Sequence, residues 1–343
     1  MKTSSHEEQY AAIYSLSDNM EIVSTANILI IGAGGLGSEI LKDLAFMGFE
    51  HIHIIDMDTI ELSNLNRQLL FAEKDVGSFK ATTAADTMRS WVPKAQITPH
   101  DCRIEEKDIY FYMEFDIIIS GLDSISARRW INEMIMQIYQ QHDMVIPFID
   151  GGTEGFKGHA RVICAGITGC FECNIDMFPP QKAYPICTLA NTPRLPEHCV
   201  QYVLKQEWQD MRVGEVFDSD NQEHVQWVYE RSKIRAQSFG IEGITLFFTL
   251  GVAKNIIPAI ASTNAIISAA CANEALKIAL AFPTLENFTM YNGESSVYTY
   301  TFKVEKNENC MVCSILTRHL ILTKASTLQD VLNGLRDLYF KLI

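Results

Sequence analysis

Two widely separated pairs of cysteines constrain this chain more than any other feature of its sequence. Cys170 and Cys173 form one CxxC pair, and Cys310 and Cys313 form the other. Paired CxxC motifs are typical of a structural zinc site, because four thiolates satisfy the tetrahedral preference of Zn²⁺. The pattern therefore predicts that the two pairs lie close together in space. The chain between them would then be a long insertion in a single domain. The alternative is that the two pairs are unrelated.

Composition excludes several classes of protein. The chain of 343 residues has a formal net charge of −14, which offers nothing to a nucleic-acid backbone. Its first ten residues contain no apolar signal region, and its apolar stretches at 244–262 and 264–282 are interrupted by polar and charged residues. Nine cysteines in such a chain indicate reduced thiols and metal ligands. We expect a cytoplasmic or nuclear protein that binds neither nucleic acid nor membrane.

The first half of the sequence alternates between strand and helix patterns. A short apolar run at 27–31 leads through glycines into a helical pattern at 38–47 and then into a second strand at 51–56. This is a β-α-β unit, and similar alternation continues to residue 150. The pattern predicts an α/β fold with a doubly wound, mostly parallel sheet of the Rossmann-like type. Later segments predict a hairpin at 158–169, helices at 197–208, 225–236 and 256–281, and strands at 287–292 and 296–304.

A glycine run after the first strand is typical of a phosphate-binding loop. The run has the form GxGGxG and contains Gly32, Gly34, Gly35 and Gly37. Such glycines let the backbone approach a phosphate at the N-terminus of a helix. Asp56, at the end of the second strand about 20 residues on, has the spacing of an acid that binds a ribose hydroxyl. These features alone fit a nicotinamide dinucleotide as well as ATP.

Charged residues farther along favour a triphosphate. Arg67 and Lys80 offer positive charge to phosphate oxygens, and Asp123, at the end of a further predicted strand, offers a ligand to Mg²⁺. A dinucleotide site does not require this set. The alternative is that Asp58 caps a turn and that Arg67 and Lys80 are solvated surface charges.

The order of these motifs resembles a known family. In chain order these are the runs GAGGLG, DMDT and SNLNRQ, the lysine at 80, the run GLDS, the first CxxC pair, the run PICTLANTP at 185–193 and the second CxxC pair. They resemble the adenylation enzymes that activate ubiquitin and its relatives, and the likeness covers about residues 20–316. Within that family, the runs at 121–130, 151–158 and 193–199 resemble the catalytic subunits that activate Nedd/Rub-type modifiers.

The resemblance implies a two-step reaction and a set of site residues. ATP with Mg²⁺ adenylates the C-terminal glycine of the modifier, and Cys187 then takes the acyl group as a thioester. Arg67, Lys80 and Asp123 are the other catalytic residues that the resemblance implies. The implied nucleotide contacts are the glycine run, Asp56 on the ribose, Asn64, Arg67 and Lys80 on the phosphates, and Asp123 on the metal, with Asp58 and Gln68 as further nucleotide-binding residues.

The resemblance also implies partners. A second, catalytically silent adenylation subunit would complete a heterodimer, and a conjugating enzyme would accept the modifier. Arg161 would select the modifier by repelling a tail that carries arginine. No residue is identified as the base that activates Cys187, although His198 is a candidate.

We expect four segments in the chain. The adenylation domain would comprise 1–173 and 241–316, with a catalytic-cysteine domain at 174–240 between them. Residues 317–343 resemble only the beginning of the family's C-terminal ubiquitin-fold domain, which recruits the conjugating enzyme. Transfer to that enzyme is therefore the step with the least support from the sequence.

Rival interpretations stay open at this point. They are a subunit that activates another modifier of the SUMO type, a sulfur-carrier adenylyltransferase, a nicotinamide oxidoreductase and a silent scaffold subunit. The long insertion that carries Cys187 argues against the sulfur-carrier enzyme. A silent subunit would have lost Lys80, Asp123 or Cys187, and all three are present.

Overall fold

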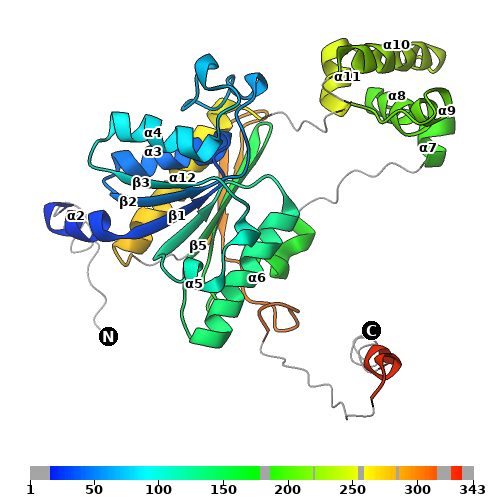
Figure 1. The fold of residues 1–343 in the computed structure, drawn as a ribbon. Coiled ribbons are helices and arrows are strands. Elements are labelled where there is room, and N and C mark those ends of the chain that lie inside the picture. Colours follow the sequence, from blue (N-terminus) through cyan, green and yellow to red (C-terminus); the bar gives the residue numbers. More distant parts are fainter. Residues whose placement is uncertain are drawn as a thin grey trace. The chain divides into compact units, whose positions relative to one another are not determined.

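The computed structural model describes most of the chain as two compact units. The described residues are 16–177, 186–218, 221–253, 259–282, 286–314 and 326–333, without the side chains of 16–19 and 186–188. Unit 1 comprises Met1–Ile175 and Ala261–Ile343, and unit 2 comprises Asp176–Ile260. Unit 1 is therefore built from two separate stretches of sequence, and unit 2 is an insertion between them (Figure 1).

Unit 1 is built on a sheet of eight strands in the order β3-β2-β1-β4-β5-β6-β7-β8. The first five strands in this order pair in parallel, and the pairs from β5 to β8 are antiparallel. The strands are β1 (Asn27–Ile31), β2 (His51–Ile55), β3 (Gln96–His100), β4 (Ile117–Ser120), β5 (Phe148–Glu154), β6 (Lys157–Ile163), β7 (Phe288–Asn292) and β8 (Tyr298–Phe302). The predicted α/β fold with a mostly parallel sheet is confirmed.

Helices cover both faces of the parallel part of the sheet. In Figure 1, α3, α4 and α12 lie against one face, and α5 and α6 lie against the other. Continuous apolar strands such as β1, whose last four residues are buried, are what a sheet covered on both sides requires. The helical segments of unit 1 are α2 (Leu16–Thr25), α3 (Gly35–Phe46), η1 (Leu62–Asn64), η2 (Glu73–Asp75), α4 (Lys80–Trp91), η3 (Ile104–Glu106), α5 (Ile109–Tyr112), α6 (Ile125–His142), η4 (Phe171–Met177, which crosses into unit 2) and α12 (Ala261–Ala279).

Unit 2 is helical within its described residues. Its core consists of Val200, Val203, Trp208 and Val228. Its helical segments are α7 (Ile186–Asn191), α8 (Pro196–Tyr202), the π-helical turn η5 (Val203–Glu207), α9 (Trp208–Met211), α10 (Gln222–Ser238) and α11 (Leu246–Ala253). The apolar side chains of α8 and η5 thus pack against α10 around one tryptophan.

The structure differs from the sequence-based expectation around residue 256. We expected one long helix from 256 to 281, but α12 begins at Ala261, and a separate helix, α11, ends at Ala253. Residues 254–258 lie outside the described residues. Apolar periodicity cannot separate two apolar helices that belong to different units, because both present the same pattern.

None of the helices in the described ranges is both long and apolar enough to cross a bilayer.

Candidate functional site

The carboxyl ends of β1, β2 and β4 meet at one edge of the sheet in unit 1. The amide of Gly32 donates to the carbonyl of Ile55 at 2.8 Å, and the amide of Gly121 donates to the carbonyl of Ile31 at 2.9 Å. Open α/β sheets bind their ligands at this edge. Most of the residues that we predicted for nucleotide binding follow these three strands.

The glycine loop is tightly packed where it turns into α3. Gly32 has φ +97°, which favours glycine, and α3 begins three residues later. A Cβ on Gly37 would lie 1.8 Å from the carbonyl oxygen of Gly32, so a side chain at 37 does not fit. The twelve-residue helix α3 therefore presents its N-terminus to the strand edge, where backbone amides and the helix dipole favour an anion.

Asp56 fastens the glycine loop to the turn after β2. Its Oδ2 accepts a hydrogen bond from the Ala33 amide at 2.6 Å, and its Oδ1 accepts one from the Asp58 amide at 2.8 Å. Burial raises the pKa of Asp56, while these hydrogen bonds and the charge of Lys80 oppose that rise. Asp56 is thus in position beside the loop where we predicted contact with a ribose.

Lys80 is held over the same turn. Its Nζ lies 2.8 Å from Oδ2 of Asp58, and its side chain is 10% exposed, compared with 54% for Asp58. Its backbone amide also donates to the Asp58 carbonyl at 3.0 Å. The alternative that Lys80 is a solvated surface charge is therefore wrong, because its side chain is largely buried and its ammonium group pairs with the carboxylate.

The segment after η1 lies beside the start of α3. The backbone and side chain of Arg67 lie 3.4 and 3.6 Å from where a Cβ on Gly35 would be. The side-chain nitrogen Nε2 of Gln68 lies 3.9 Å from where a Cβ on Gly34 would be. Gln68 is buried, and its Oε1 has no hydrogen-bond partner in the described part of the chain. The glycine loop thus lies beside a buried amide oxygen that lacks a hydrogen-bond partner among the described residues. This arrangement fits a polar ligand such as a nucleotide.

Two of these side chains are also fixed locally. Arg67 Nη1 donates to the carbonyl of Ser63 and to Oδ1 of Asn66, both at 3.1 Å. Asn64 is buried, and its Oδ1 accepts from the Glu61 amide at 3.0 Å. Both side chains are therefore held in their conformations by hydrogen bonds within their own segment.

Asp123 is exposed on the loop that follows β4, and a buried network that we did not predict holds this loop. Arg128 Nη2 donates to the carbonyls of Leu122 at 2.5 Å and Gly151 at 3.0 Å. Its Nε lies 3.3 Å from Asp150, a fully buried carboxylate. The loop that carries Asp123 is thus tied to β5 through Arg128.

Asp150 is the centre of that network. Burial opposes its ionisation, but the charge of Arg128 and the hydrogen bond from His159 hold its pKa well below its usual range. The Ser120 hydroxyl donates to it at 2.8 Å, and His159 Nε2 lies 3.2 Å away. The sequence carried a signal for this network, since an arginine lies in a predicted helix and an aspartate ends a predicted strand, but spacing alone did not show that they pair.

Asn264 also reaches the glycine loop without having been predicted. It lies on α12, far away in sequence, and its Nδ2 is 2.5 Å from where a Cβ on Gly35 would be. Its Oδ1 accepts from the Thr153 hydroxyl at 2.7 Å. Gly35 therefore leaves room for a buried amide as well as for a ligand.

The four cysteines of the two CxxC pairs form one cluster in unit 1. Their sulfur atoms all lie within 4.8 Å of one another. The Sγ–Sγ distances are 3.5 Å between Cys170 and Cys310, 3.8 Å between Cys170 and Cys173, and 3.4 Å between Cys173 and Cys313. Tetrahedral zinc with Zn–S bonds of about 2.3 Å requires sulfur atoms about 3.8 Å apart, and a disulfide would require about 2.05 Å. The cluster therefore fits a zinc ion and excludes a disulfide.

The surroundings of the cluster also suit a metal–thiolate centre. The Asn307 amide donates to Cys173 Sγ at 3.4 Å, and the Phe171 amide donates to Oδ1 of the buried Asn132 on α6 at 2.8 Å. These bonds fix the two segments that supply the ligands. The prediction that residues near 170 and 313 meet is confirmed, since both segments contribute to one cluster.

Arg161 is fully buried in β6. Its guanidinium lies 5.3 Å from the ring centroid of Phe171 and 5.7 Å from that of Phe288. Within the described residues its three guanidinium nitrogens have no hydrogen-bond partner, and burial lowers its pKa. Its role in modifier selectivity stays a prediction.

Cys187 is the second residue of α7 in unit 2, and its side chain lies outside the described residues. His198, the candidate base, is 6% exposed at the start of α8, and its Nδ1 accepts from the Arg194 amide at 3.1 Å. This bond places the proton of neutral His198 on Nε2. His198 is therefore a buried part of the helix start.

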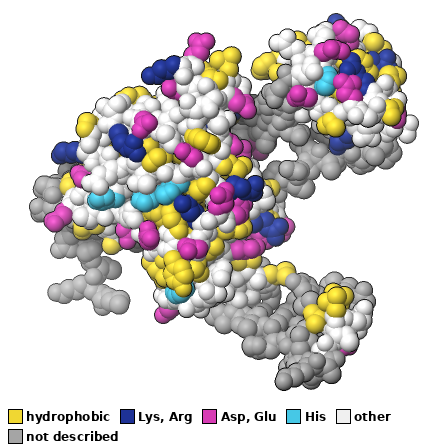
Figure 2. Space-filling view, viewed as in Figure 1, with side chains coloured by type: hydrophobic (Ala, Val, Ile, Leu, Met, Phe, Trp, Pro, Cys, Tyr) yellow, Lys and Arg dark blue, Asp and Glu magenta, His cyan; other side chains and the backbone are white. Residues whose placement is uncertain are grey.

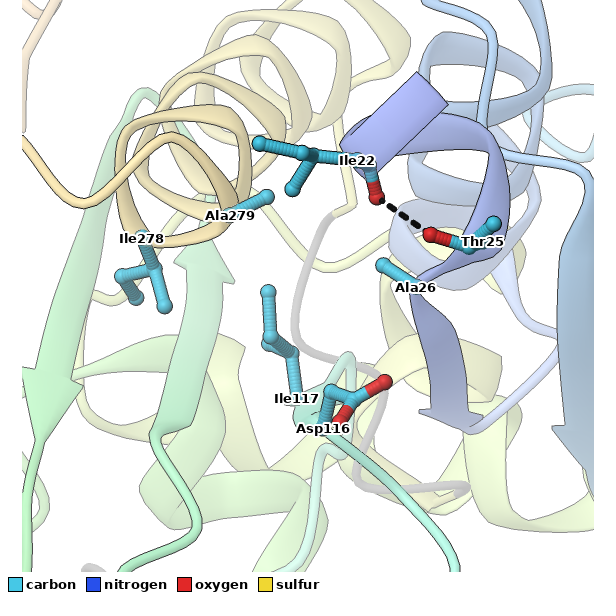
Figure 3. Close-up of a pocket in the computed structure, with 7 residues that line it drawn as sticks. All are labelled: Ile22, Thr25, Ala26, Asp116, Ile117, Ile278 and Ala279. Atoms are coloured by element: carbon cyan, nitrogen blue, oxygen red, sulfur yellow. Dashed lines mark hydrogen bonds between the residues drawn. The ribbon is translucent and has the colours of Figure 1, made fainter. Parts of the chain in front are cut away.

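A cavity of about 350 Å³ lies at the opposite, amino end of the strands (Figure 3). Its lining residues come from α2, the starts of β1 and β4, and the end of α12: Ile22, Thr25, Ala26, Asp116, Ile117, Ile278 and Ala279. Its lining mixes polar and apolar groups, and open parallel sheets bind their ligands at the other edge. The carboxyl edge, with its glycine loop and charged groups, is the candidate nucleotide site.

Comparison with known proteins agrees with the geometry. A model of the ThiF family matches residues 6–312. The Nedd8-activating enzyme E1 catalytic subunit of Drosophila melanogaster is 49% identical over 333 residues, which cover 94% of this chain and 74% of the relative. The NEDD8-activating enzyme E1 catalytic subunit of Dictyostelium discoideum is 52% identical over 318 residues, which cover 89% of this chain and 72% of the relative.

A solved structure shares the fold. The crystal structure of E. coli MccB with ATP superposes with a TM-score of 0.54 at 18% sequence identity, covering 86% of this chain and 69% of that chain. At this level of identity the likeness supports the architecture alone.

Proposed function

Because the chain belongs to the ThiF family and, within it, to the NEDD8-activating enzyme E1 catalytic subunits, we propose that it activates a Nedd/Rub-type modifier in two steps. The first step joins the modifier's C-terminal carboxylate to AMP, and the second moves the acyl group to Cys187. The support comes from the meeting of the glycine loop, Asp56 and Lys80 at one strand edge in a chain of this family.

In the first step, a carboxylate oxygen of the modifier attacks the α-phosphorus of the substrate ATP, and pyrophosphate leaves. Two anions approach each other, so positive charge must offset their repulsion. Lys80 and Arg67 supply this charge, and the start of α3 binds phosphate through its amides. Asp123 would hold Mg²⁺, which would neutralise further phosphate charge. Asp56 would orient the ribose.

In the second step, the thiolate of Cys187 attacks the activated carbonyl carbon. A C–S bond forms, the bond from carbon to the AMP oxygen breaks, and AMP leaves with the electron pair. The thiol proton goes to solvent or to a base that we do not assign. Cys187 belongs to unit 2 and the nucleotide residues to unit 1, so we propose that a rearrangement of unit 2 brings the sulfur to the acyl group.

Partners and surroundings complete the proposal. We propose a catalytically silent adenylation subunit as heterodimer partner and a conjugating enzyme as acceptor. The cysteine cluster would hold a structural zinc ion. A cytoplasmic or nuclear location suits the described cysteines, none of which forms a disulfide.

The two steps can be separated experimentally. ATP–pyrophosphate exchange in the presence of purified modifier reports the first step, and a thiol-sensitive modifier adduct reports the second. We expect Cys187→Ala to retain exchange and lose the adduct, because the sulfur takes no part in adenylation. Loss of exchange in a folded Cys187→Ala variant would contradict the two-site scheme.

The metal role and the modifier are tested in the same assay. Asp123→Ala should lose both exchange and adduct, and retained exchange would remove its proposed role. A panel of Nedd/Rub-type, SUMO-type and sulfur-carrier proteins should show exchange with the first alone. A clear preference for another carrier would favour the corresponding alternative.

A further inference from the structure

The helix that carries Cys187 is anchored by an arginine from another helix of unit 2. Arg235 lies near the end of α10, and its Nη2 donates to the carbonyls of Leu189 at 2.6 Å and Ala190 at 2.7 Å. These two carbonyls belong to the last turn of α7, which runs from Ile186 to Asn191. A cation at this end satisfies carbonyls that have no partner within the helix and also offsets the negative end of the helix dipole.

The Arg235 side chain is itself held in place. Its guanidinium lies 3.5 Å from the ring centroid of Tyr202, the last residue of α8, and 5.1 Å from that of Phe239. Stacking of this kind fixes the plane of a guanidinium and so the direction of its donors. Arg235 therefore joins α7, α8 and α10 through one side chain.

Helix α7 needs such an anchor. It has six residues, and isolated helices of this length are unstable because nucleation fixes several residues for few hydrogen bonds. Contacts from outside must then determine its orientation. The two hydrogen bonds from Arg235 join α7 at its end, close in sequence to Cys187.

We propose that Arg235 is a positioning residue for thioester formation: it holds the last turn of α7 so that Cys187 is presented to the acyl group. It acts through α7 and touches no reacting atom. This inference rests on the proposed function of Cys187. It makes the second step, but not adenylation, depend on Arg235.

The test compares Arg235→Ala and Arg235→Lys in the complex of the full chain with its partner subunit. Single-turnover thioester formation on Cys187 should slow about tenfold in Arg235→Ala, which corresponds to about 1.4 kcal/mol in activation free energy. The modifier concentration for half-maximal rate and the ATP–pyrophosphate exchange should not change. Arg235→Lys should recover most of the rate, because an ammonium group still donates to the carbonyls.

Arg231 provides the matched control. It lies one turn earlier on α10, pairs with Glu207 at 2.9 Å and lies over the Trp227 ring at 5.9 Å. Arg231→Ala should therefore keep the wild-type rate of thioester formation. Amide hydrogen exchange in 186–191 should become faster in Arg235→Ala and remain as in wild type in Arg231→Ala, which reports the loss of the anchor directly.

The possible outcomes separate the two claims. An Arg235→Ala enzyme that forms the thioester at the wild-type rate would overturn the inference. So would equal slowing in Arg231→Ala with no recovery in Arg235→Lys, since that pattern indicates a general loss of packing in unit 2. A wild-type enzyme with normal exchange that never forms an adduct on Cys187 would instead overturn the proposed function.

Discussion

At the scale of single residues, the glycine loop gives the sharpest prediction. A methyl group at 37 would lie 1.8 Å from the carbonyl oxygen of Gly32, which forces the loop or the start of α3 to shift. We expect Gly37→Ala to lower ATP–pyrophosphate exchange by at least about a hundredfold, because a 1 Å displacement of binding groups can cost that much.

A second glycine supplies the control for this prediction. Gly251 lies within α11, where an added Cβ meets nothing within 4 Å. Gly251→Ala should leave exchange unchanged and stabilise the helix by up to about 1 kcal/mol. Similar exchange rates in the two variants would contradict the assignment of the glycine loop to the nucleotide.

The charged residues show what the sequence could and could not predict at this scale. Spacing after the second strand was enough to predict that Asp56 approaches the glycine loop, because strand ends share an edge. Spacing could not predict that Arg128 and Arg161 are buried, since arginine is usually exposed and its burial depends on partners distant in sequence. For Arg128 the partner is Asp150, and for Arg161 the neighbours are two phenylalanine rings.

At the scale of elements, the edge formed by β2 and β3 carries a pair of histidines. Figure 2 shows histidine side chains gathered over these two strands. His53 Nδ1 lies 3.0 Å from His100 Nε2, an arrangement that requires at least one neutral ring. Burial, with the charges of Lys107 and His53, lowers the pKa of His100 from 6.5 to about 4, and burial also lowers the pKa of His53.

This pair predicts a pH dependence of stability. Between pH 6.5 and 4 the unfolded chain binds a proton at His100 that the folded chain does not bind, so the free energy of unfolding falls as the pH falls through this window. His100→Gln should show a smaller decrease. Urea unfolding midpoints at pH 7.5, 6 and 5 would measure the effect, and equal decreases in wild type and variant would count against it.

Helices and strands were predictable where the hydrophobic pattern of a segment matches its burial in the fold. The run 27–31 is apolar after Asn27 and is followed by glycines, and it forms β1 in the interior of the sheet. The helix α11 was missed because it is apolar on all sides and adjoins another apolar stretch. Where periodicity is absent, only the tertiary structure determines where one helix ends and the next begins.

At the scale of the whole molecule, the cysteine cluster explains how unit 1 can contain a long insertion. Two cysteines of the cluster precede unit 2 in sequence and two follow it. The cluster therefore joins the two stretches of sequence that build unit 1, on either side of the insertion. The sequence alone predicted that the two CxxC pairs meet, because one pair supplies only two of the four ligands that a structural zinc ion needs. It could not predict how the insertion folds, because five prolines lie among residues 179–196 and leave little periodicity to read.

Removal of the metal should therefore destabilise unit 1 rather than abolish a chemical step directly. We expect about one zinc ion per chain by elemental analysis, and Cys310→Ser should reduce this content. Zinc contributes about 10–16 kcal/mol to the folding of isolated zinc fingers, but unit 1 keeps its own core, so we expect a smaller loss of about 3 kcal/mol. Such a loss would lower the melting temperature by roughly 6–12 °C. Cys102→Ser, outside the cluster, should change neither zinc content nor melting temperature. A purified chain without zinc, or a melting temperature that a chelator leaves unchanged, would show that unit 1 is stable without a metal at the four thiols.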